Sequence, residues 1–234
     1  MATSHIESLS QISDNYFWWR GRFEWVVESL KGFPAKTYID IGCGDGFFAK
    51  KLNSTLHFSR VGLIDGEKTL LDKVKDFSKA ELFLKDLSKP LELPFVPDLI
   101  SMMDVLEHLK DDEAFLKNLY QAMRHGSRLV VSVPALPYAF SEWDKQLGHF
   151  RRYYKSELDK KLKAAGFKTV SITYAWSFLV PSAISRRFKT KRYQQNMEFE
   201  KIPNWLNTLL FSMFKVERFF SPPIGTSVFA IGEK

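Results

Sequence analysis

The sequence predicts an α/β fold, a doubly wound and mostly parallel sheet of seven strands with helices on both faces. Two observations predict it. From residue 37 onward, short runs of apolar and β-branched residues alternate with segments that have the periodicity of helices. A glycine-rich loop joins the first of these runs to the first helix. Alternation of this kind is typical of a parallel sheet with helices packed on both sides.

Seven segments are expected to form the strands, and four helices connect them. The fifth strand is closed by Pro134, and Gly166 ends the last of the four helices, as glycine commonly does. The strands are Thr37–Ile41, Arg60–Ile64, Leu82–Leu84, Leu99–Met103, Arg128–Val133, Thr169–Tyr174 and Ser227–Ile231. The helices are Phe47–Asn53, Glu67–Phe77, Asp111–Met123 and Lys155–Ala165.

Further helices flank this core. Residues 1–31 predict one or two helices, because aromatic and aliphatic residues recur there at roughly helical spacing. About 50 residues separate the last two strands, too many for a structureless loop, and Trp176–Phe188 and Asn204–Phe219 are predicted as helices. These outer segments could form lids over a ligand pocket, or simply pack on the sheet.

We therefore expect a single domain in three parts. The parts are a helical cap over residues 1–35, a core over 36–176 and 227–234, and a helical insertion over 177–226. The length of 234 residues, with 45% hydrophobic and 26% charged residues, fits one globular domain.

Two simple observations bear on the compartment. The single cysteine, Cys43, excludes an intrachain disulfide and a zinc site built from cysteines. No stretch approaches the roughly 18 consecutive apolar residues of a membrane span, and the first residues lack a basic-then-apolar signal pattern. We therefore expect a cytoplasmic protein.

The net charge of +7 is unevenly distributed. Residues 1–140 carry 17 basic against 19 acidic side chains, whereas residues 141–234 carry 17 against 8. A basic C-terminal part suits an anionic acceptor, or peripheral contact with the anionic inner face of a membrane. A solvated basic face would explain the charge equally well. Five basic residues cluster in the insertion: Arg186, Arg187, Lys189, Lys191 and Arg192.

The loop after the first strand has the composition of a ligand-binding turn. It runs from Asp40 to Gly46 and places glycine at every second position from Gly42, which lets the backbone turn tightly and approach a ligand closely. The spacing differs from the G-x-G-x-x-G of dinucleotide enzymes, and no Lys-Ser/Thr pair follows as in a P-loop. Taken alone, such a loop indicates only a nucleotide-type site.

Carboxylates follow the next two strands. Asp65 ends the second strand and could accept hydrogen bonds from both hydroxyls of a ribose, which disfavours a 2′-phosphate and hence NADP. Asp86 follows the third strand, where it could accept a hydrogen bond from an adenine amino group. Each aspartate alone is more often a turn or cap residue. Together with the glycine loop, they indicate an adenosyl ligand at the carboxyl edge of the sheet.

These motifs, in this order, resemble those of class I S-adenosylmethionine-dependent methyltransferases. Tyr38–Gly46 resembles their first motif, and Asp104–Leu109 resembles the segment after the fourth strand in many small-molecule methyltransferases, including ubiquinone-pathway O-methyltransferases. The resemblance covers about residues 37–135 and implies a Rossmann-like fold, S-adenosylmethionine as cofactor and methyl transfer. It implies these cofactor-binding residues: Asp40, Gly42, Cys43, Gly44, Gly46, Asp65, Gly66, Asp86, Leu87, Met103 and Asp104.

A further resemblance lies outside this stretch. Phe17–Arg22, Trp143–Asp144 and Gly148–Tyr153 are similar to segments of bacterial methyltransferase-like proteins, several of which are associated with cell-surface polysaccharide or lipid pathways. The acceptor-binding residues predicted from these segments are Trp143, His149, Arg151, Arg152 and Tyr153.

His149 is the candidate general base. It follows a glycine in the loop after the fifth strand, where acceptors are expected to enter, and a neutral imidazole near pH 7 can remove a proton from a hydroxyl. Alternatively, the ring orders the loop through a backbone contact. Arg151, Arg152 and Tyr153 could hold an anionic acceptor, or form a solvated loop end before the next helix.

A metal site is an alternative for one segment. Ubiquinone-pathway enzymes place an acid, an acid and a histidine around a divalent cation at offsets occupied here by Asp104, Glu107 and His108. Two carboxylates and an imidazole could bind Mg²⁺ or a transition metal. The same segment could instead contact the cofactor or cap the next turn, and the predicted site includes no metal.

The sequence therefore predicts an enzyme that transfers a methyl group from S-adenosylmethionine to the oxygen or nitrogen of a small or medium acceptor, saccharide- or lipid-linked. Two alternatives stay open: an RNA methyltransferase, in keeping with the basic C-terminal part, and a non-catalytic protein that binds the cofactor and regulates a partner. Nucleic acid is disfavoured, because no N-P-P-Tyr signature and no RNA-binding appendage is recognisable. We expect a monomer or a homodimer.

Overall fold

The computed structural model describes residues 16–74, 77–187 and 202–234. Its centre is one seven-stranded sheet in the order β3-β2-β1-β4-β5-β7-β6. All neighbouring strands run parallel except β7, which is antiparallel to both β5 and β6. The strands are β1 (Thr37–Ile41), β2 (Arg60–Asp65), β3 (Ala80–Leu84), β4 (Leu99–Met103), β5 (Arg128–Pro134), β6 (Lys168–Ala175) and β7 (Ser227–Glu233).

The strand order reverses at the centre of the sheet. β1 pairs with β2 on one side and with β4 on the other, so the connections after β1 and β4 leave in opposite directions. Ligands of open α/β sheets bind at such a switch point, beyond the carboxyl ends of the strands. The topology therefore directs attention to the loops that follow Ile41 and Met103.

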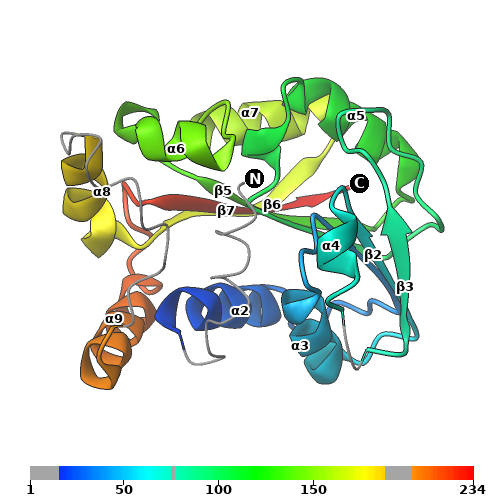
Figure 1. Cartoon of the computed structure of the whole chain (residues 1–234), viewed down its shortest axis with the longest axis horizontal. Helices are drawn as coiled ribbons and strands as arrows, with labels where there is room; N and C mark the ends of the chain where they lie inside the picture. Colours follow the sequence, from blue (N-terminus) through cyan, green and yellow to red (C-terminus); the bar gives the residue numbers. More distant parts are fainter. Residues whose placement is uncertain (1–15, 75–76, 188–201) are drawn as a thin grey trace.

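Helices cover both faces of the sheet (Figure 1). On one face lie α5 (Asp112–Ala122), α6 (Glu142–Leu147) and α7 (Lys155–Ala165). On the other lie α2 (Phe17–Ser29), α3 (Phe47–Leu56) and α9 (Asn204–Glu217). Two further helices are α4 (Lys68–Leu71) and α8 (Val180–Arg187), and three single turns are η1 (Leu106–His108), η2 (Pro137–Ala139) and η3 (Ser177–Leu179).

Alternation along the strands builds two cores. Successive side chains of a strand point to opposite faces, so Ile39 and Ile41 join the α5–α7 side while Tyr38 joins the α2–α3 side. Because both faces are covered, the central strands are almost entirely apolar and buried. The sheet is thus a rigid platform for the loops at its carboxyl edge.

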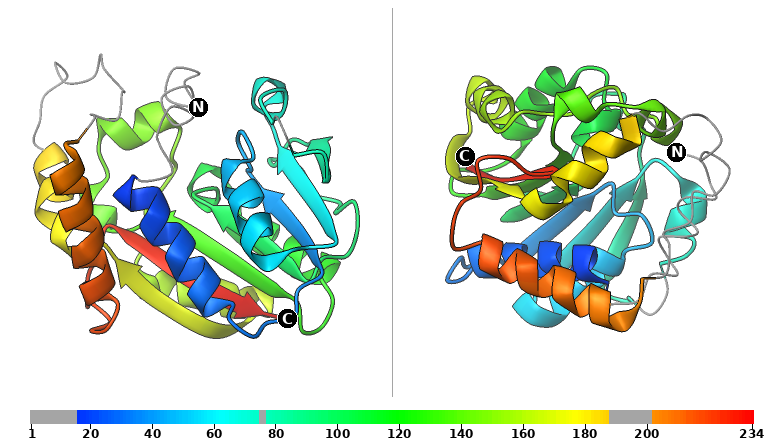
Figure 2. Two further views of the ribbon diagram at one scale, coloured as in Figure 1. Left: turned by 90° about the horizontal axis from the view of Figure 1, so that it is seen from below. Right: turned by 90° about the vertical axis from the view of Figure 1, so that its left-hand side faces the viewer.

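The first and last described helices pack against each other. Gly21 of α2 lies so close to Phe214 of α9 that an added Cβ would be 2.9 Å from its ring. The Phe17 amide donates a 2.7 Å hydrogen bond to Asn207 Oδ1, and the rings of Trp18 and Trp176 stack with centroids 3.9 Å apart. Figure 2 shows α2 and α9 side by side at one flank of the sheet. Segments far apart in the sequence therefore close the same side of the molecule.

The structure confirms the predicted sheet, with two differences in the helices. Of the helix predicted over Glu67–Phe77, the structure shows only the short α4, and residues 75–76 lie outside the described residues. Helix α6 was not predicted, although Ser141 and Asp144 form a capping box at its start. The division into cap, core and insertion stays a prediction, and Lys189, Lys191 and Arg192 lie outside the described residues.

No helix in the described part of the chain is long and apolar enough to cross a membrane.

Candidate active site

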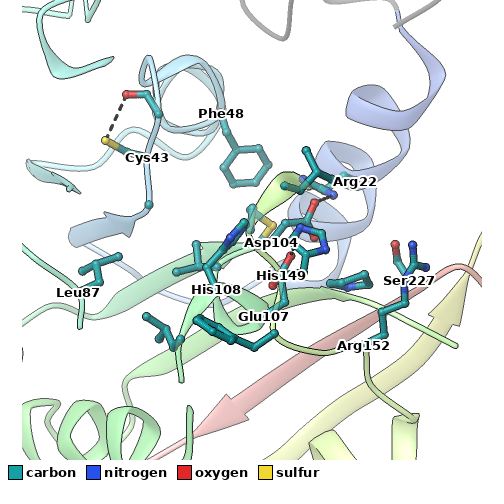
Figure 3. Close-up of a pocket in the computed structure, with 18 of the residues that line it drawn as sticks. Arg22, Cys43, Phe48, Leu87, Asp104, Glu107, His108, His149, Arg152 and Ser227 are labelled. Atoms are coloured by element: carbon teal, nitrogen blue, oxygen red, sulfur yellow. Dashed lines mark hydrogen bonds and ion pairs between the residues drawn. The ribbon is translucent and has the colours of Figure 1, made fainter. Parts of the chain in front are cut away.

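A cavity of about 1570 Å³ opens at the carboxyl edge of the sheet, where the strand order reverses. Small-molecule pockets usually enclose about 300–1,000 Å³, so this cavity has room for a cofactor and a second molecule. Its walls come from the glycine loop, the ends of β2, β3 and β4, the segment after β5, and helices α2, α6 and α8. Figure 3 shows the side chains that gather in its centre.

The glycine loop has the geometry expected of a ligand cradle. Gly42 has φ of 71°, a conformation that residues with side chains rarely adopt, and an added Cβ would lie 2.4 Å from Val105 Cγ2. The amides of Gly42 and Cys43 both donate to the Ile64 carbonyl, which fixes the loop to β2. Gly46, at φ of 75°, then starts α3. This N-terminus is directed toward the cavity-lining loop, as in helix-based anion sites.

Asp65 joins the glycine loop to the second strand. Its carboxylate accepts hydrogen bonds from the Gly44 amide at 2.8 Å and from the Glu67 amide at 2.9 Å. Each carboxylate oxygen has two lone pairs, so both can still accept a ribose hydroxyl. Asp86 lies exposed at the cavity wall after β3, where its carboxylate accepts hydrogen bonds from the Ser88 amide and hydroxyl.

Asp40 lies deeper, at the end of β1. It is 3% exposed, and its carboxylate accepts a hydrogen bond from the Ser101 hydroxyl. Burial raises the pKa of Asp40 to about 7; the nearby Asp65 carboxylate adds to the increase and the Ser101 hydroxyl opposes it. A buried carboxylate of this kind favours a cationic group of a ligand at the same place.

The predicted cofactor residues come together with one exception. Gly46 does not line the cavity and acts through the start of α3. The residues that line it are Asp40, Gly42, Cys43, Gly44, Asp65, Gly66, Asp86, Leu87, Met103 and Asp104. Their assignment to individual cofactor atoms stays a prediction.

Asp104 is held by a residue of the N-terminal helix. Arg22 Nη2 lies 2.5 Å from Asp104 Oδ2, and the Ser132 hydroxyl donates to Asp104 Oδ1 at 2.9 Å. Arg22 is only 1% exposed, and Asp104 has φ of 56°. The resemblance of the Phe17–Arg22 segment to other proteins had not indicated this partner. The ion pair ties α2 across the cavity to the end of β4.

His149 is oriented by a neighbour that sequence reasoning missed. Its Nδ1 lies 3.1 Å from Asp144 Oδ1. The same oxygen of the fully buried Asp144 also accepts a 2.7 Å hydrogen bond from Arg152 Nε. Burial raises the pKa of Asp144, but the hydrogen bonds from His149 and Arg152 outweigh it and leave the pKa lowered. An ionised Asp144 makes Nδ1 a donor of the ring. In the neutral ring, Nε2 then carries the lone pair, and His149 lines the cavity.

Glu107 and His108 lie beside this nitrogen. Glu107 Oε1 is 4.0 Å from His149 Nε2, and the two histidine rings meet edge to face with centroids 4.7 Å apart. Burial and the nearby Asp104 carboxylate raise the pKa of Glu107, and burial together with His149 lowers the pKa of His108 to about 4. One ligand atom from each of Glu107, His108 and His149 lies within 4.8 Å of the others. This group could hold a cation, whereas Asp104 is engaged by Arg22.

Two predicted acceptor residues face away from the cavity. Tyr153 is completely buried, and its hydroxyl donates to Asp112 Oδ2 at 2.7 Å. Arg151 Nη1 lies 2.8 Å from the other oxygen of Asp112, and its Nη2 donates to the Lys110 carbonyl. Both residues fix the segment after β5 to α5 and neither lines the cavity; their part in acceptor binding stays a prediction. Trp143, His149 and Arg152 do line the cavity.

Comparison with known proteins identifies the chain. A family model described as a methyltransferase domain matches residues 23–172. The chain belongs to this methyltransferase family. Membership confirms the predicted enzyme class, with S-adenosylmethionine as methyl donor.

Individual relatives are distant. The chain is 24% identical over 170 residues to the ubiquinone biosynthesis O-methyltransferase of Coxiella burnetii, covering 62% of this chain and 68% of the relative. It is 22% identical over 153 residues to the mitochondrial ubiquinone biosynthesis O-methyltransferase of Schizosaccharomyces pombe, covering 56% and 55%.

A solved structure shares the fold. The N-methyltransferase NodS of Bradyrhizobium japonicum, in complex with S-adenosyl-L-homocysteine, superposes with a TM-score of 0.61 at 16% identity, covering 99% of this chain and 98% of NodS.

Proposed function

We propose that this methyltransferase transfers a methyl group to a hydroxyl oxygen of a medium-sized acceptor, saccharide- or lipid-linked. The observation that carries the proposal is the contact of Asp144 with His149 Nδ1, because the His149 ring lines the cavity with Nε2 as its second nitrogen. The bound cofactor supplies a methyl group already activated by a sulfonium charge. What a hydroxyl acceptor needs in addition is alignment and the loss of its proton.

The pair is suited to proton removal. Asp144 accepts from Nδ1, which fixes the ring and its tautomer, and an ionised carboxylate stabilises the imidazolium that forms when Nε2 takes a proton. Arg152 binds the same carboxylate oxygen and holds it in place at 2.7 Å. An acceptor oxygen within hydrogen-bond reach of Nε2 would then be available for in-line attack. A nitrogen acceptor is the alternative. A neutral amine can attack the methyl group without a general base, so transfer to nitrogen would not require the Asp144–His149 pair.

The far end of the cavity favours an amphipathic and anionic acceptor. Leu179, Ala183 and Leu210 give it an apolar wall, and Arg186 and Arg187 of α8 stand at the same end. The guanidinium of Arg186 lies 5.8 Å from the Trp143 ring centroid, and that of Arg187 lies 4.1 Å from the Tyr138 ring centroid. Two arginines beside aromatic rings suit a phosphate or carboxylate attached to an apolar or saccharide body.

Helix α9 supports contact with an anionic membrane. The basic balance of residues 141–234 complements anionic headgroups, and Lys215 and Arg187 lie in that part of the chain. Large apolar side chains of α9 and the turn after it are exposed: Trp205, Leu209, Met213, Val216, Phe219, Phe220 and Ile224. An apolar helix face with aromatic anchors and nearby cations is typical of interfacial helices. We propose that this face docks on the membrane that presents a lipid-linked acceptor.

The experiment that tests the proposed function is transfer from S-adenosyl-[methyl-¹³C]methionine to lipid, saccharide and RNA extracts. A labelled methyl ether in the lipid or saccharide extract supports the proposal. Label in RNA alone, or on nitrogen alone, contradicts it.

A further inference from the structure

Strand β3 forms one edge of the sheet (Figure 1). It pairs with β2 on one side, and no strand in the described part of the chain pairs with its other side. An unpaired edge presents backbone N–H and C=O groups that can bind another strand, and natural proteins usually protect such edges. The outer side of β3 is therefore a place where a partner strand can extend the sheet.

Two features that commonly protect an edge are missing from β3. Its sequence over Ala80–Leu84 contains no proline, and its register with β2 runs through consecutive residue pairs without a bulge. Strand β6, at the opposite edge of the sheet, has an irregular register between Thr169 and Ser171. Because a bulge twists an edge and interrupts pairing, β3 is the edge that is better suited to accept a strand.

The outer part of β3 also exposes apolar side chains. Leu82 and Leu84 are 45% and 56% exposed, although the neighbouring strand β2 is almost completely buried. Helix α4, which precedes β3 in the chain, has only four residues, and both leucines remain exposed. A partner strand with apolar side chains on the same face would remove them from water, which is favourable.

The backbone of β3 determines which residues a partner strand can bind. The Lys85 amide donates a 3.0 Å hydrogen bond to the Asp65 carbonyl of β2. Alternate residues of a strand direct their backbone groups to the same side, so Phe83 also faces β2, whereas Leu82 and Leu84 face the free edge. A partner must therefore form its backbone hydrogen bonds with Leu82 and Leu84.

A second copy of β3 meets this requirement when it runs antiparallel and the pair is centred on Phe83. Leu82 of one copy then lies opposite Leu84 of the other, and such a residue pair exchanges two backbone hydrogen bonds. In the same register, Glu81 lies opposite Lys85 of the second copy. The twofold symmetry forms each of these contacts twice, and opposite-charge and apolar cross-strand pairs both stabilise a sheet.

The side chains favour this register over its neighbours. Centring the pair on Leu82 would place Lys79 opposite Lys85 of the second copy. Centring it on Leu84 would place Leu82 opposite Asp86. Like charges directly opposite each other destabilise a sheet, and an aspartate offers a leucine no apolar contact. One register is thus self-complementary, as a twofold interface requires.

We propose that the protein forms a twofold homodimer in which the β3 strands of two copies pair antiparallel, so that one sheet runs through both copies. Glu81 already forms an exposed ion pair with Arg60, and Lys85 of the second copy brings a second cation to the same carboxylate. An interface built on one short strand from each copy is small, so the dissociation constant lies in the micromolar range. The proposal is independent of the methyl acceptor.

Sedimentation of the protein over the micromolar range tests the dimer. We expect an equilibrium between monomer and dimer that depends on concentration. Glu81→Lys and Lys85→Glu should each weaken the dimer at least about tenfold, because each places like charges opposite each other twice. Glu113→Lys is the matched control: it makes the same charge change in an exposed ion pair on α5, and its dimer should be as stable as that of the wild-type protein.

Mixing the two charge variants separates this interface from any other. In a mixed dimer both cross-strand pairs again join opposite charges. Equimolar Glu81→Lys and Lys85→Glu should therefore form a heterodimer at a concentration at which neither variant dimerises alone. Hydrogen exchange of the wild-type protein is a second readout. The amides of Leu82 and Leu84 should exchange more slowly in the dimer, whereas that of Val170 in the edge strand β6 should not change.

Three results would overturn the proposal. The first is a wild-type protein that stays monomeric throughout the micromolar range. The second is a dimer that forms equally well in both charge variants. The third is a dimer in which the Leu82 and Leu84 amides exchange as fast as in the monomer, which would place the contact elsewhere on the surface. Circular dichroism and urea unfolding verify that each variant is folded, and none of the readouts depends on methyl transfer.

Discussion

Arg22 Nη2 lies 2.5 Å from Asp104 Oδ2, and this contact joins the first described helix to the switch point of the sheet. Arg22 is buried to 1% exposure, so its charge depends on Asp104 for compensation. The pair closes α2 over the cavity between two segments that are 82 residues apart in the sequence.

Loss of this pair is expected to destabilise the fold. Removing one member of a fully buried ion pair costs about 3–5 kcal/mol, and because Asp104 is 35% exposed we expect about 2 kcal/mol for Arg22→Ala. Arg60→Ala, which breaks the solvent-screened surface pair with Glu81, should cost clearly less than Arg22→Ala. Urea unfolding of both variants measures the difference, and equal losses would contradict the account.

Asp144→Asn is expected to release the His149 ring from its single tautomer. The neutral amide oxygen holds the Nδ1 proton less strongly than the ionised carboxylate, so ¹⁵N chemical shifts of His149 should change toward a tautomer mixture. Once an acceptor has been identified, kcat of Asp144→Asn should be about 100-fold lower than that of the wild-type protein, while cofactor affinity is retained. Ser141→Ala is the matched control, because it removes only the capping contact to Asp144. Unchanged shifts in Asp144→Asn would refute the orienting role.

Asp40 is expected to make stability depend on pH. Its folded pKa of about 7 lies above the ordinary value of 3.8, so its contribution is fully present below about pH 4 and is lost as pH rises through 7. Asp40→Asn has no such titration and should show a smaller decline in unfolding free energy between pH 4 and 7. The comparison uses urea unfolding without cofactor. A decline of the same size in both proteins would show that Asp40 does not titrate in this range.

Gly42→Ala should lower the free energy of unfolding by more than the positive φ of Gly42 alone would cause. A positive φ costs an alanine about 1 kcal/mol, and the added Cβ would also meet Val105 Cγ2 at 2.4 Å. Gly126→Ala has a similar φ of 80° with no atom within 4 Å and isolates the angle. We expect Gly42→Ala to lose at least about 1 kcal/mol more, and to weaken cofactor binding in calorimetry. Equal behaviour of the two variants would argue against a tight cradle.

The exposed apolar side chains of α9 and of the turn after it are expected to bind anionic vesicles. Trp205, Phe219 and Phe220 are 68%, 84% and 75% exposed, so replacing all three with serine should leave folding intact. Flotation with vesicles containing phosphatidylserine should recover the wild-type protein and not the triple variant. Absence of wild-type binding at low salt would remove the membrane from the proposal.

The sequence was sufficient for the sheet because strand periodicity and turn residues are local signals. Thr37–Ile41 and the glycines after it mark a strand and a cradle without reference to the rest of the chain. Asp65 and Asp86 could be placed at the same edge because parallel strands end together. The length of the helix predicted over Glu67–Phe77 was overestimated, since periodicity marks a helix better than it marks where the helix ends.

The contacts that shape the proposed acceptor-binding part of the cavity could not be predicted from the sequence. Arg22–Asp104 and Glu107–His149 join segments that are distant in the chain, and no local pattern pairs them. Tyr153 followed two arginines in an apparently exposed loop, yet its hydroxyl points to Asp112 in the core. One signal was available: Ser141 and Asp144 have the spacing of a capping box, which would have marked α6 and drawn attention to Asp144.

The central claim is transfer of the methyl group to a hydroxyl whose proton is lost at His149. Its most direct test is product analysis by mass spectrometry after incubation of the wild-type protein and His149→Ala with ¹³C-methyl-labelled cofactor and lipid and saccharide extracts. The account expects a labelled methyl ether with the wild-type protein, and a yield at least about 100-fold lower with His149→Ala at unchanged cofactor affinity. Equal yields from the two proteins, or label confined to nitrogen, would contradict it.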